Sequence, residues 1–379
     1  MIPVSNNPFY LSPWMPEAFF CGREKDIRTL TANIRKGDNT LLYAAPQTGK
    51  TSLLYQLLRW SEIRDEYHTL YVVLRGTKSQ YDFFCALRDA LRCKNVFSTY
   101  PSTYPDNVVK RAEALDAELF RTAAGGNSEE LRWASEAAVE EMLFLLDKNG
   151  PGVVVFDDFH EIEYYERSMA ALLRTHIQFL ANTRFIYASG DMPMVWKIFD
   201  SPKEAFYHSA STYTPRDILV DDYLAFCQKC MALGGKTISR ESVELVCSLF
   251  RGNMGHMQEV MHRAYEAPDV AVTPAVIEEV IGKILEQRRN IYKDFMEGLG
   301  SDDLRNMVIM LGREGIVRHE DLVEKARWYG VSEDADVFEL WRELSFRAVP
   351  IALRRDDGYY LANGMLRLWI SWGFFAICC

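Results

Sequence analysis

The amino-acid sequence predicts an α/β protein built on a parallel β-sheet. Three short apolar runs support this prediction: Leu41–Ala45, Tyr71–Leu74 and Gly152–Phe156. Strands that are buried on both faces of a parallel sheet have continuous apolar sequences of this kind. Segments with the apolar spacing of helices separate the runs, as the crossover connections of a parallel sheet require. The chain has 379 residues, which is enough for roughly two or three domains.

Composition and charge are those of an ordinary globular protein, with 48% hydrophobic and 25% charged residues. The net charge of −10 argues against extensive coating of nucleic acid. We find neither an apolar run of about 20 residues, as a membrane span needs, nor the pattern of a signal peptide at the start. We therefore expect a cytoplasmic protein with no membrane partner. Cys227 and Cys230 have the spacing of a metal or redox pair, but no second pair follows, so we expect two thiols on a helix.

The first apolar run continues into a segment with the pattern of a phosphate-binding loop. A turn ending in Gly49 leads to Lys50 and Thr51, which open an amphipathic helix. Backbone N–H groups in such a turn and the positive end of the helix dipole bind anions. The lysine reaches β- and γ-phosphates, and the threonine hydroxyl completes a magnesium site. The pattern G-x-x-x-x-G-K-[ST] requires glycine where this chain has Ala44. The predicted nucleotide-binding residues are Ala45, Pro46, Gln47, Thr48, Gly49, Lys50, Thr51 and Ser52.

A pair of carboxylates, Asp157 and Asp158, follows the third apolar run. Ligands collect at the carboxyl ends of parallel strands, so we expect both side chains to lie beside Lys50. In phosphate-binding proteins of this kind the first carboxylate holds magnesium and the second polarises the attacking water. We therefore assign Thr51 and Asp157 to Mg²⁺ and Asp158 to catalysis, with ATP as the nucleotide. A lone Asp-Asp pair would more often cap a helix, but the two motifs in this order favour nucleotide binding.

The rest of the chain is predicted to be mainly helical. One further strand is expected at Arg184–Ala188, followed by Ser189-Gly190-Asp191, where a polar residue could sense the γ-phosphate or belong to a plain turn. Tyr207–Tyr213 is the last strand expected in the sheet. Near the C-terminus, three helices and a hairpin at Ala352–Leu361, turning at Asp356–Gly358, make a winged helix. The predicted segments are an arm at 1–20, which either walls the base pocket or simply packs, a core at 21–217 with a helical insertion at about 93–148, a helical lid at 218–287 and a winged helix at 288–379.

Taken together, these residues resemble an archaeal-type ATPase of the STAND branch of AAA-like P-loop proteins. The resemblance implies a P-loop NTPase (ASCE/AAA-like) core in which the sensor strand lies between the two Walker strands, followed by a helical lid and a winged helix. It also implies an ATP-dependent switch that contacts a protein partner or a second copy of itself. The motifs that carry it are Phe20–Glu24, Gly49–Leu53, Val153–Ile162, Phe199–Tyr207, Gly252–Met254 with Gln258, and Tyr359–Ile370.

Several positions depart from the family pattern. The family has glycine and then Pro-Arg-Arg ahead of T-G-K-T, where this chain has Ala44 and then Ala45, Pro46 and Gln47. The family's Asp-Glu pair is Asp-Asp here, and aspartate is one methylene shorter. A water held about an ångström too far costs on the order of a hundredfold in rate. We therefore expect nucleotide binding with slow hydrolysis.

The sequence is also compatible with two other functions. A DNA-binding or loader-type ATPase would use Arg342, Arg347, Arg354 and Arg355 of the winged helix for phosphate contacts. Acidic residues beside them, among them Glu339 and Glu343, favour a protein contact instead. The departures from the family motifs also allow a catalytically inactive scaffold that nucleotide stabilises.

Overall fold

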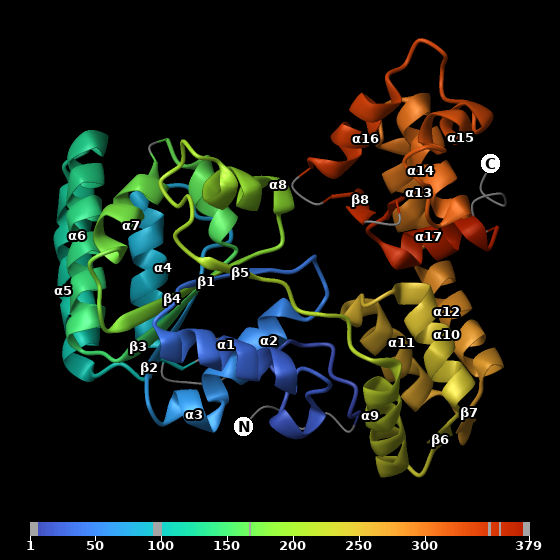
Figure 1. Ribbon diagram of the computed structural model, residues 1–379, viewed down its shortest axis with the longest axis horizontal. Helices are drawn as coiled ribbons and strands as arrows, with labels where there is room; N and C mark the ends of the chain where they lie inside the picture. The colour runs from blue at the N-terminus through green and yellow to red at the C-terminus, as the bar shows by residue number, and fades with distance from the viewer. Residues whose placement is uncertain (1–6, 94–100, 167, 348–349, 356–357, 374–379) are drawn as a thin grey trace. The chain divides into compact units, whose positions relative to one another are not determined.

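The computed structural model describes residues 7–93, 101–166, 168–347, 350–355 and 358–373 (Figure 1). These residues fall into two compact units. Unit 1 contains Ser12–Asp222, and unit 2 contains the described residues from Tyr223 onward. The short segment Asn7–Leu11 belongs to unit 2, although it directly precedes the first residues of unit 1 in the sequence.

Unit 1 is built on a five-stranded sheet, and its four strand pairings are all parallel. The strand order is β2-β3-β4-β1-β5, so β4 lies between β1 and β3, as the resemblance implied. This is the sheet of a P-loop NTPase, and the predicted fold class is confirmed. The strands are β1 (Thr40–Tyr43), β2 (His68–Val73), β3 (Gly152–Asp157), β4 (Thr183–Ser189) and β5 (Ser211–Tyr213).

The last strand is shorter than the sequence predicts. Only Ser211–Tyr213 pairs with β1, whereas the prediction extended back to Tyr207. The missing residues form tight turns instead: the amide of Tyr207 donates to Glu204, and the amide of Ser209 donates to Phe206. A left-handed His208 between them, with φ 52°, interrupts any extended run.

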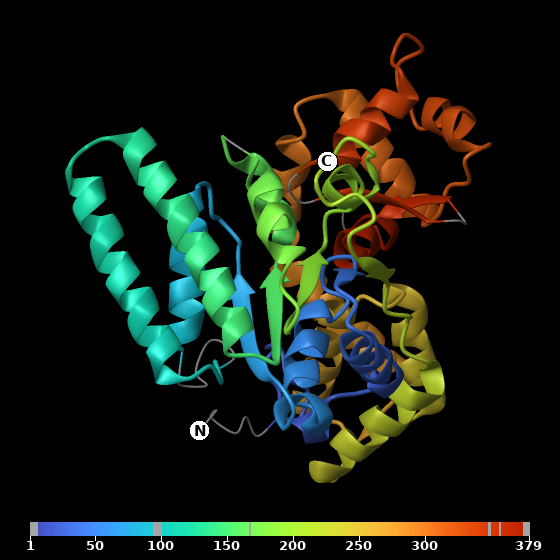
Figure 2. The same cartoon turned by 60° about the vertical axis from the view of Figure 1, so that its left-hand side comes forward.

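Alternate residues of the strands enter two separate cores. On one face, Leu42, Tyr71 and Val155 pack with helices α1 (Glu24–Lys36) and α2 (Lys50–Arg59). On the other face, Val154 and Phe156 pack beneath further helices. These helices are α4 (Gln80–Arg92), α5 (Asp106–Ala124), α6 (Ser128–Lys148) and α7 (Met169–Ile177). Figures 1 and 2 show α5 and α6 side by side as a long hairpin, within the range where we predict a helical insertion.

Short elements complete unit 1. Among the residues that the structure describes, the segment 12–23 has one turn of 3₁₀-helix and is otherwise irregular. The short elements are η1 (Glu17–Phe19), α3 (Ser61–Arg64), η2 (Phe159–Tyr164), α8 (Met192–Val195) and η3 (Trp196–Asp200).

Unit 2 is almost entirely helical. Where we predict the lid, it has α9 (Val220–Leu233), α10 (Arg240–Phe250), α11 (Met254–Glu266) and α12 (Pro274–Gln287), with strands β6 (Thr237–Ile238) and β7 (Ala271–Val272). Cys227 and Cys230 are both buried on α9, as two helix-borne thiols. Among the described residues, no helix combines the length and the apolar character needed to cross a membrane.

The C-terminal part of unit 2 has three helices followed by a hairpin. They are α14 (Asp302–Glu314), α15 (Leu322–Trp328) and α16 (Val337–Ser345), with the antiparallel strands β8 (Ala352–Arg355) and β9 (Gly358–Leu361); α13 (Arg289–Glu297) precedes them and α17 (Gly364–Ser371) follows. Val317 forms an antiparallel bridge with Tyr359 of β9. The predicted turn residues Asp356 and Asp357 lie outside the described residues, and the winged-helix assignment stays a prediction.

Candidate nucleotide-binding site

The loop between β1 and α2 has the backbone of an anion-binding turn. Left-handed conformations fall on Gln47 (φ 63°) and Gly49 (φ 90°), whereas Ala44, at the motif's glycine position, has an ordinary negative φ. Alanine is therefore tolerated there without backbone strain. Hydrogen bonds hold the loop: the amide of Ala44 donates to Ser189 over 3.2 Å, and the amide of Thr48 donates to Ala45 over 3.3 Å.

Helix α2 begins at Lys50 with Gly49 as its N-cap, and no side chain of the described residues caps it. The first N–H groups of a helix have no intrahelical partner, and with the helix dipole they attract an anion. Lys50, Thr51 and Ser52 form this first turn, while the exposed Pro46 and Gln47 form the outer part of the loop. The predicted phosphate-binding residues therefore follow one another around a single turn.

A buried ion pair connects this helix with strand β3. The Nζ atom of Lys50 contacts Asp157 Oδ1 and lies 3.7 Å from Asp158 Oδ1. Thr51 Oγ1 donates to Asp157 Oδ2 over 3.2 Å. Burial alone would raise the pKa of Asp157, but the charge and hydrogen bond of Lys50, helped by Tyr71, bring that pKa below its usual value. Asp157 is thus a carboxylate fixed beside the two predicted phosphate and magnesium ligands.

The carboxylate of Asp158 also lies near Lys50. The Asp158 backbone is left-handed, with φ 56°, and it lies between the end of β3 at Asp157 and the start of the 3₁₀-helix η2. Arg75, which follows β2, donates from Nε to Asp158 Oδ2 over 3.0 Å. The Arg75 side chain is 78% exposed, so Asp158 is bound from the solvent side by an arginine and from the loop side by Lys50.

A third polar side chain reaches the carboxylates from strand β2. The hydroxyl of Tyr71 donates to Asp157 Oδ2, and the ring is buried. Burial, reinforced by the neighbouring Asp157 charge, raises the pKa of Tyr71 well above its ordinary value, so the hydroxyl stays protonated. Tyr71 is therefore a permanent hydrogen-bond donor to the carboxylate.

The buried Arg23 braces the loop from the start of α1. Its Nη2 atom donates to the carbonyl of Thr48 over 3.0 Å, and its Nη1 atom contacts the carbonyl of Arg216 and Asp26. At the end of β4, Ser189 Oγ lies 3.0 Å from His160 Nδ1. These contacts fix the surroundings of the loop through residues far apart in the sequence.

The residues present fit Mg²⁺ and a nucleoside triphosphate. Mg²⁺ is usually held by one or two protein oxygens together with phosphate oxygens and water. Thr51 Oγ1 and Asp157 Oδ2, 3.2 Å apart, supply such oxygens next to the open helix terminus. Within the described part of the chain, no group of three or more His, Cys, Asp and Glu side chains could hold a metal. The donor set is thus suited to a hard cation shared with phosphate.

The sequence identified the central residues of this cluster but missed three others. Lys50, Thr51, Asp157 and Asp158 are brought together, as two motifs at parallel strand ends predict. Tyr71, Arg75 and Arg23 were not predicted as site residues. Tyr71 and Arg75 stand in and after the apolar run that becomes β2, but only the structure shows that this strand is the neighbour of β3.

Comparisons with known proteins agree with the fold. No protein-family model matches the chain, and no curated protein matches it. Among solved structures, a Walker-type ATPase of Pyrococcus abyssi superposes with a TM-score of 0.66 at 15% identity, covering 96% of this chain and 99% of that one. The ORC2 protein of Aeropyrum pernix, in ADPNP–ADP complexes, superposes with a TM-score of 0.56 at 12% identity, covering 98% of each chain. At this identity the likeness concerns the fold, which extends over nearly the whole chain in both cases.

Proposed function

We propose that the protein binds ATP with Mg²⁺ in unit 1, hydrolyses it slowly and acts as a nucleotide-dependent switch of the STAND type. The observation that carries the proposal is the convergence of Lys50 and Thr51, from the phosphate loop, on Asp157 at the end of β3. In this role Lys50 binds the β- and γ-phosphates, while Thr51 and Asp157 hold the magnesium. When bound, the metal ion neutralises charge on the phosphates.

Hydrolysis in this proposal depends on Asp158. Its carboxylate orients the attacking water and accepts its proton. Two features make the step slow. Arg75 lies against the Asp158 carboxylate, and its positive charge competes with a water molecule for that carboxylate. The loop also carries Pro46 and Gln47 where relatives implied by the sequence resemblance have arginines, so less positive charge stabilises the transition state.

We propose that the output is a contact with a protein, made through unit 2, whose helices we assign to a lid and a winged helix. Three of the four arginines suggested for DNA binding, Arg342, Arg347 and Arg354, have partners within the chain. Arg342 lies 2.8 Å from Glu339, and Arg347 lies 2.9 Å from Glu343. Arg347 also follows the end of α16 instead of lying on it. Arg354 stacks over a tyrosine ring, with 5.5 Å to the ring centre. These pairings support a protein partner or self-association in preference to DNA.

Calorimetric titration of the full chain with ATP and Mg²⁺ tests the nucleotide proposal. We expect saturable binding that Lys50→Ala abolishes, because the variant loses the phosphate ligand. Lys36→Ala, at the exposed end of α1, is the matched control and should bind like wild type. Absence of binding by wild type, or equal binding by the Lys50 variant, would show that this loop is not a nucleotide site.

Turnover and the output need separate assays. A steady-state ATPase assay should give a measurable rate that Asp158→Asn abolishes, whereas zero turnover in wild type would leave the chain a nucleotide-stabilised scaffold. Fluorescence titration with duplex DNA across a range of salt should show no salt-dependent binding. A steep fall of affinity with salt would establish the DNA-binding alternative.

A further inference from the structure

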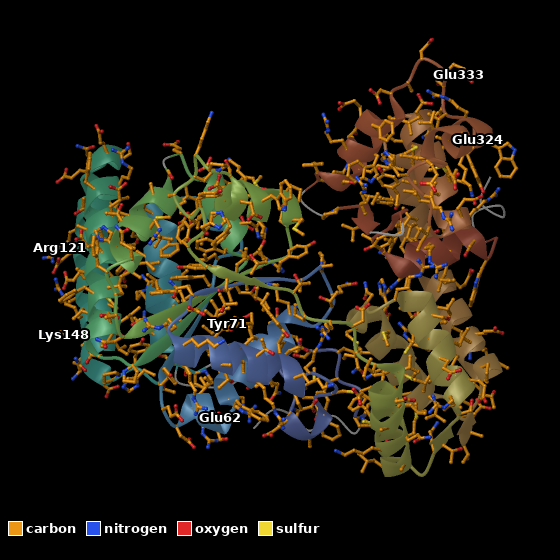
Figure 3. The ribbon with its side chains drawn as sticks, viewed as in Figure 1. Glu62, Tyr71, Arg121, Lys148, Glu324 and Glu333 are labelled. Atoms are coloured by element: carbon orange, nitrogen blue, oxygen red, sulfur yellow. The ribbon has the colours of Figure 1, made fainter. Side chains whose placement is uncertain are left out.

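Tyr71 reaches the magnesium carboxylate because of the register between β2 and β3. Tyr71 pairs with Val155, and Asp157 follows two residues later on the same face of the sheet. Both side chains therefore point to the side covered by α1 and α2, where Lys50 and Thr51 lie. Figure 3 labels Tyr71 in this interior of unit 1, and its ring is 1% exposed.

The two oxygens of Asp157 have different partners. Oδ1 accepts hydrogen bonds from Lys50 Nζ and from the backbone amide of Asp158, the latter over 3.0 Å. Oδ2 accepts hydrogen bonds from the hydroxyls of Thr51 and Tyr71. In the proposed function Lys50 turns to phosphate and Thr51 to the metal, so both leave the carboxylate. Tyr71 is assigned to neither phosphate nor metal, so its hydrogen bond is the side-chain contact that keeps Asp157 oriented.

The Tyr71 ring is held in turn by the N-terminal arm. Trp14 packs edge-on against Tyr71, with ring centres 6.0 Å apart, and against Tyr55 of α2 at 4.8 Å. The next residue, Met15, accepts a hydrogen bond of 2.9 Å from the buried Gln56 through its carbonyl. Edge-on aromatic pairs prefer one ring orientation, so the arm restricts the angle at which the Tyr71 hydroxyl approaches Asp157.

We propose that Tyr71 is a positioning residue for the magnesium ligand Asp157, and that Trp14 of the N-terminal arm holds Tyr71 in place. This inference rests on the proposed function of the same site. It makes the N-terminal arm part of the metal site, not a plain packing element. Because coupling between sites is reciprocal, an arm that favours metal binding is itself tightened when the metal is bound.

Titration of Mg²⁺ at saturating ATP, followed by calorimetry, tests the role of Tyr71. Tyr71→Phe keeps the ring and removes the hydroxyl, and we expect the half-saturating Mg²⁺ concentration to rise about tenfold, as loss of a hydrogen bond to a charged group costs. ATP binding in EDTA should not change. The matched control is Tyr55→Phe, since Tyr55 also packs on Trp14 but its hydroxyl accepts from Arg59 Nη1 over 3.2 Å instead of binding Asp157.

The possible results distinguish the positioning role of Tyr71 from nucleotide binding itself. Wild-type Mg²⁺ dependence in Tyr71→Phe, or an equal loss of ATP affinity with and without Mg²⁺, would overturn the positioning role while leaving nucleotide binding intact. Absence of ATP binding by wild type would overturn the proposed function and this inference together. Equal effects of Tyr71→Phe and Tyr55→Phe would indicate a general packing defect and would also overturn it.

The arm is tested by a substitution at Trp14. Trp14→Leu keeps an apolar side chain but removes the edge-on ring contacts, and it should raise the half-saturating Mg²⁺ concentration about threefold, the effect of losing roughly 0.7 kcal/mol of aromatic pairing. Leu11→Ala, at an exposed position of the same arm, is the control and should have no effect. Unchanged Mg²⁺ dependence in Trp14→Leu would refute the arm's part in the site.

Discussion

The ion pair between Lys50 and Asp157 allows a double-mutant test of the site in the absence of nucleotide. Both side chains are nearly enclosed, with exposed fractions of 11% and 6%. Removing one partner of a buried pair leaves an uncompensated charge, whereas removing both leaves none. The perturbation consists of Lys50→Met, Asp157→Asn and the combination of the two.

The remaining contacts set the size of the expected effect. A broken buried pair costs about 3–5 kcal/mol when the remaining charge has no other partner. Here Asp157 keeps Tyr71 and Thr51, and Lys50 keeps Asp158 at 3.7 Å. We therefore expect each single substitution to cost about 2 kcal/mol, and the double variant also about 2 kcal/mol, which corresponds to a coupling of about 2 kcal/mol.

Urea unfolding at pH 7, followed by circular dichroism, measures these free energies. The control cycle combines Asp157→Asn with Lys36→Met, whose lysine is exposed at the end of α1, and should be additive. A Lys50–Asp157 double variant that loses about 4 kcal/mol, the sum of the singles, would show that the two charges do not stabilise each other and would refute this reasoning.

Three further predictions concern other residues. Arg75→Ala should raise the steady-state ATPase rate about two- to fivefold, because it frees Asp158 from an exposed ion pair worth up to about 1 kcal/mol. Burial lowers the pKa of His256 to about 4, so between about pH 6.5 and pH 4 the unfolded chain binds a proton that the folded chain does not. The free energy of unfolding of wild type therefore falls as the pH falls through this window. Between pH 7 and pH 4, measured by urea unfolding, this fall should be smaller in His256→Gln than in wild type by up to about 3 kcal/mol. Gly312→Ala should lower the thermal stability of the protein by about 1–2 kcal/mol, because its Cβ would lie 2.7 Å from Ile370 Cδ1.

Each of these has its own control. An unchanged or lower ATPase rate in Arg75→Ala would mean that the arginine does not restrain Asp158. For His256, parallel stability curves of variant and wild type between pH 4 and pH 7 would contradict the buried neutral imidazole. Gly282→Ala on α12, where an added Cβ meets nothing within 4 Å, should be neutral or stabilising by up to about 1 kcal/mol; similar losses for both glycines would contradict the clash at Gly312.

Much of the core of this fold could be predicted from local patterns. Continuous apolar runs identified β1, β2 and β3, since a strand covered on both faces has no polar side to alternate with. The end of the sheet was predicted less well. Tyr207 and His208 carry the aromatic rings that are common in strands. Their backbone amides, however, donate hydrogen bonds to Glu204 and Phe199 instead of to a neighbouring strand. Such turns depend on contacts that a few consecutive residues of sequence do not reveal.

The site shows the same division. Gly49, Lys50 and Thr51 could be assigned to a phosphate loop from the sequence because the motif of such a loop is one contiguous turn whose chemistry depends on adjacent residues. Tyr71 could not, because its role depends on lying one register step from Asp157, 86 residues away. Arg75 was hidden for the same reason, 83 residues from its partner Asp158.

The sequence by itself indicated which groups could bind phosphate and magnesium, because each of the two motifs is contiguous in the chain and its chemistry is local. Only the tertiary structure decided what contacts these groups. The pairing of β2 with β3 places a tyrosine hydroxyl on Asp157, and the N-terminal arm places Trp14 against that tyrosine. These contacts join segments that have no common sequence pattern, and packing in the folded chain brings them together.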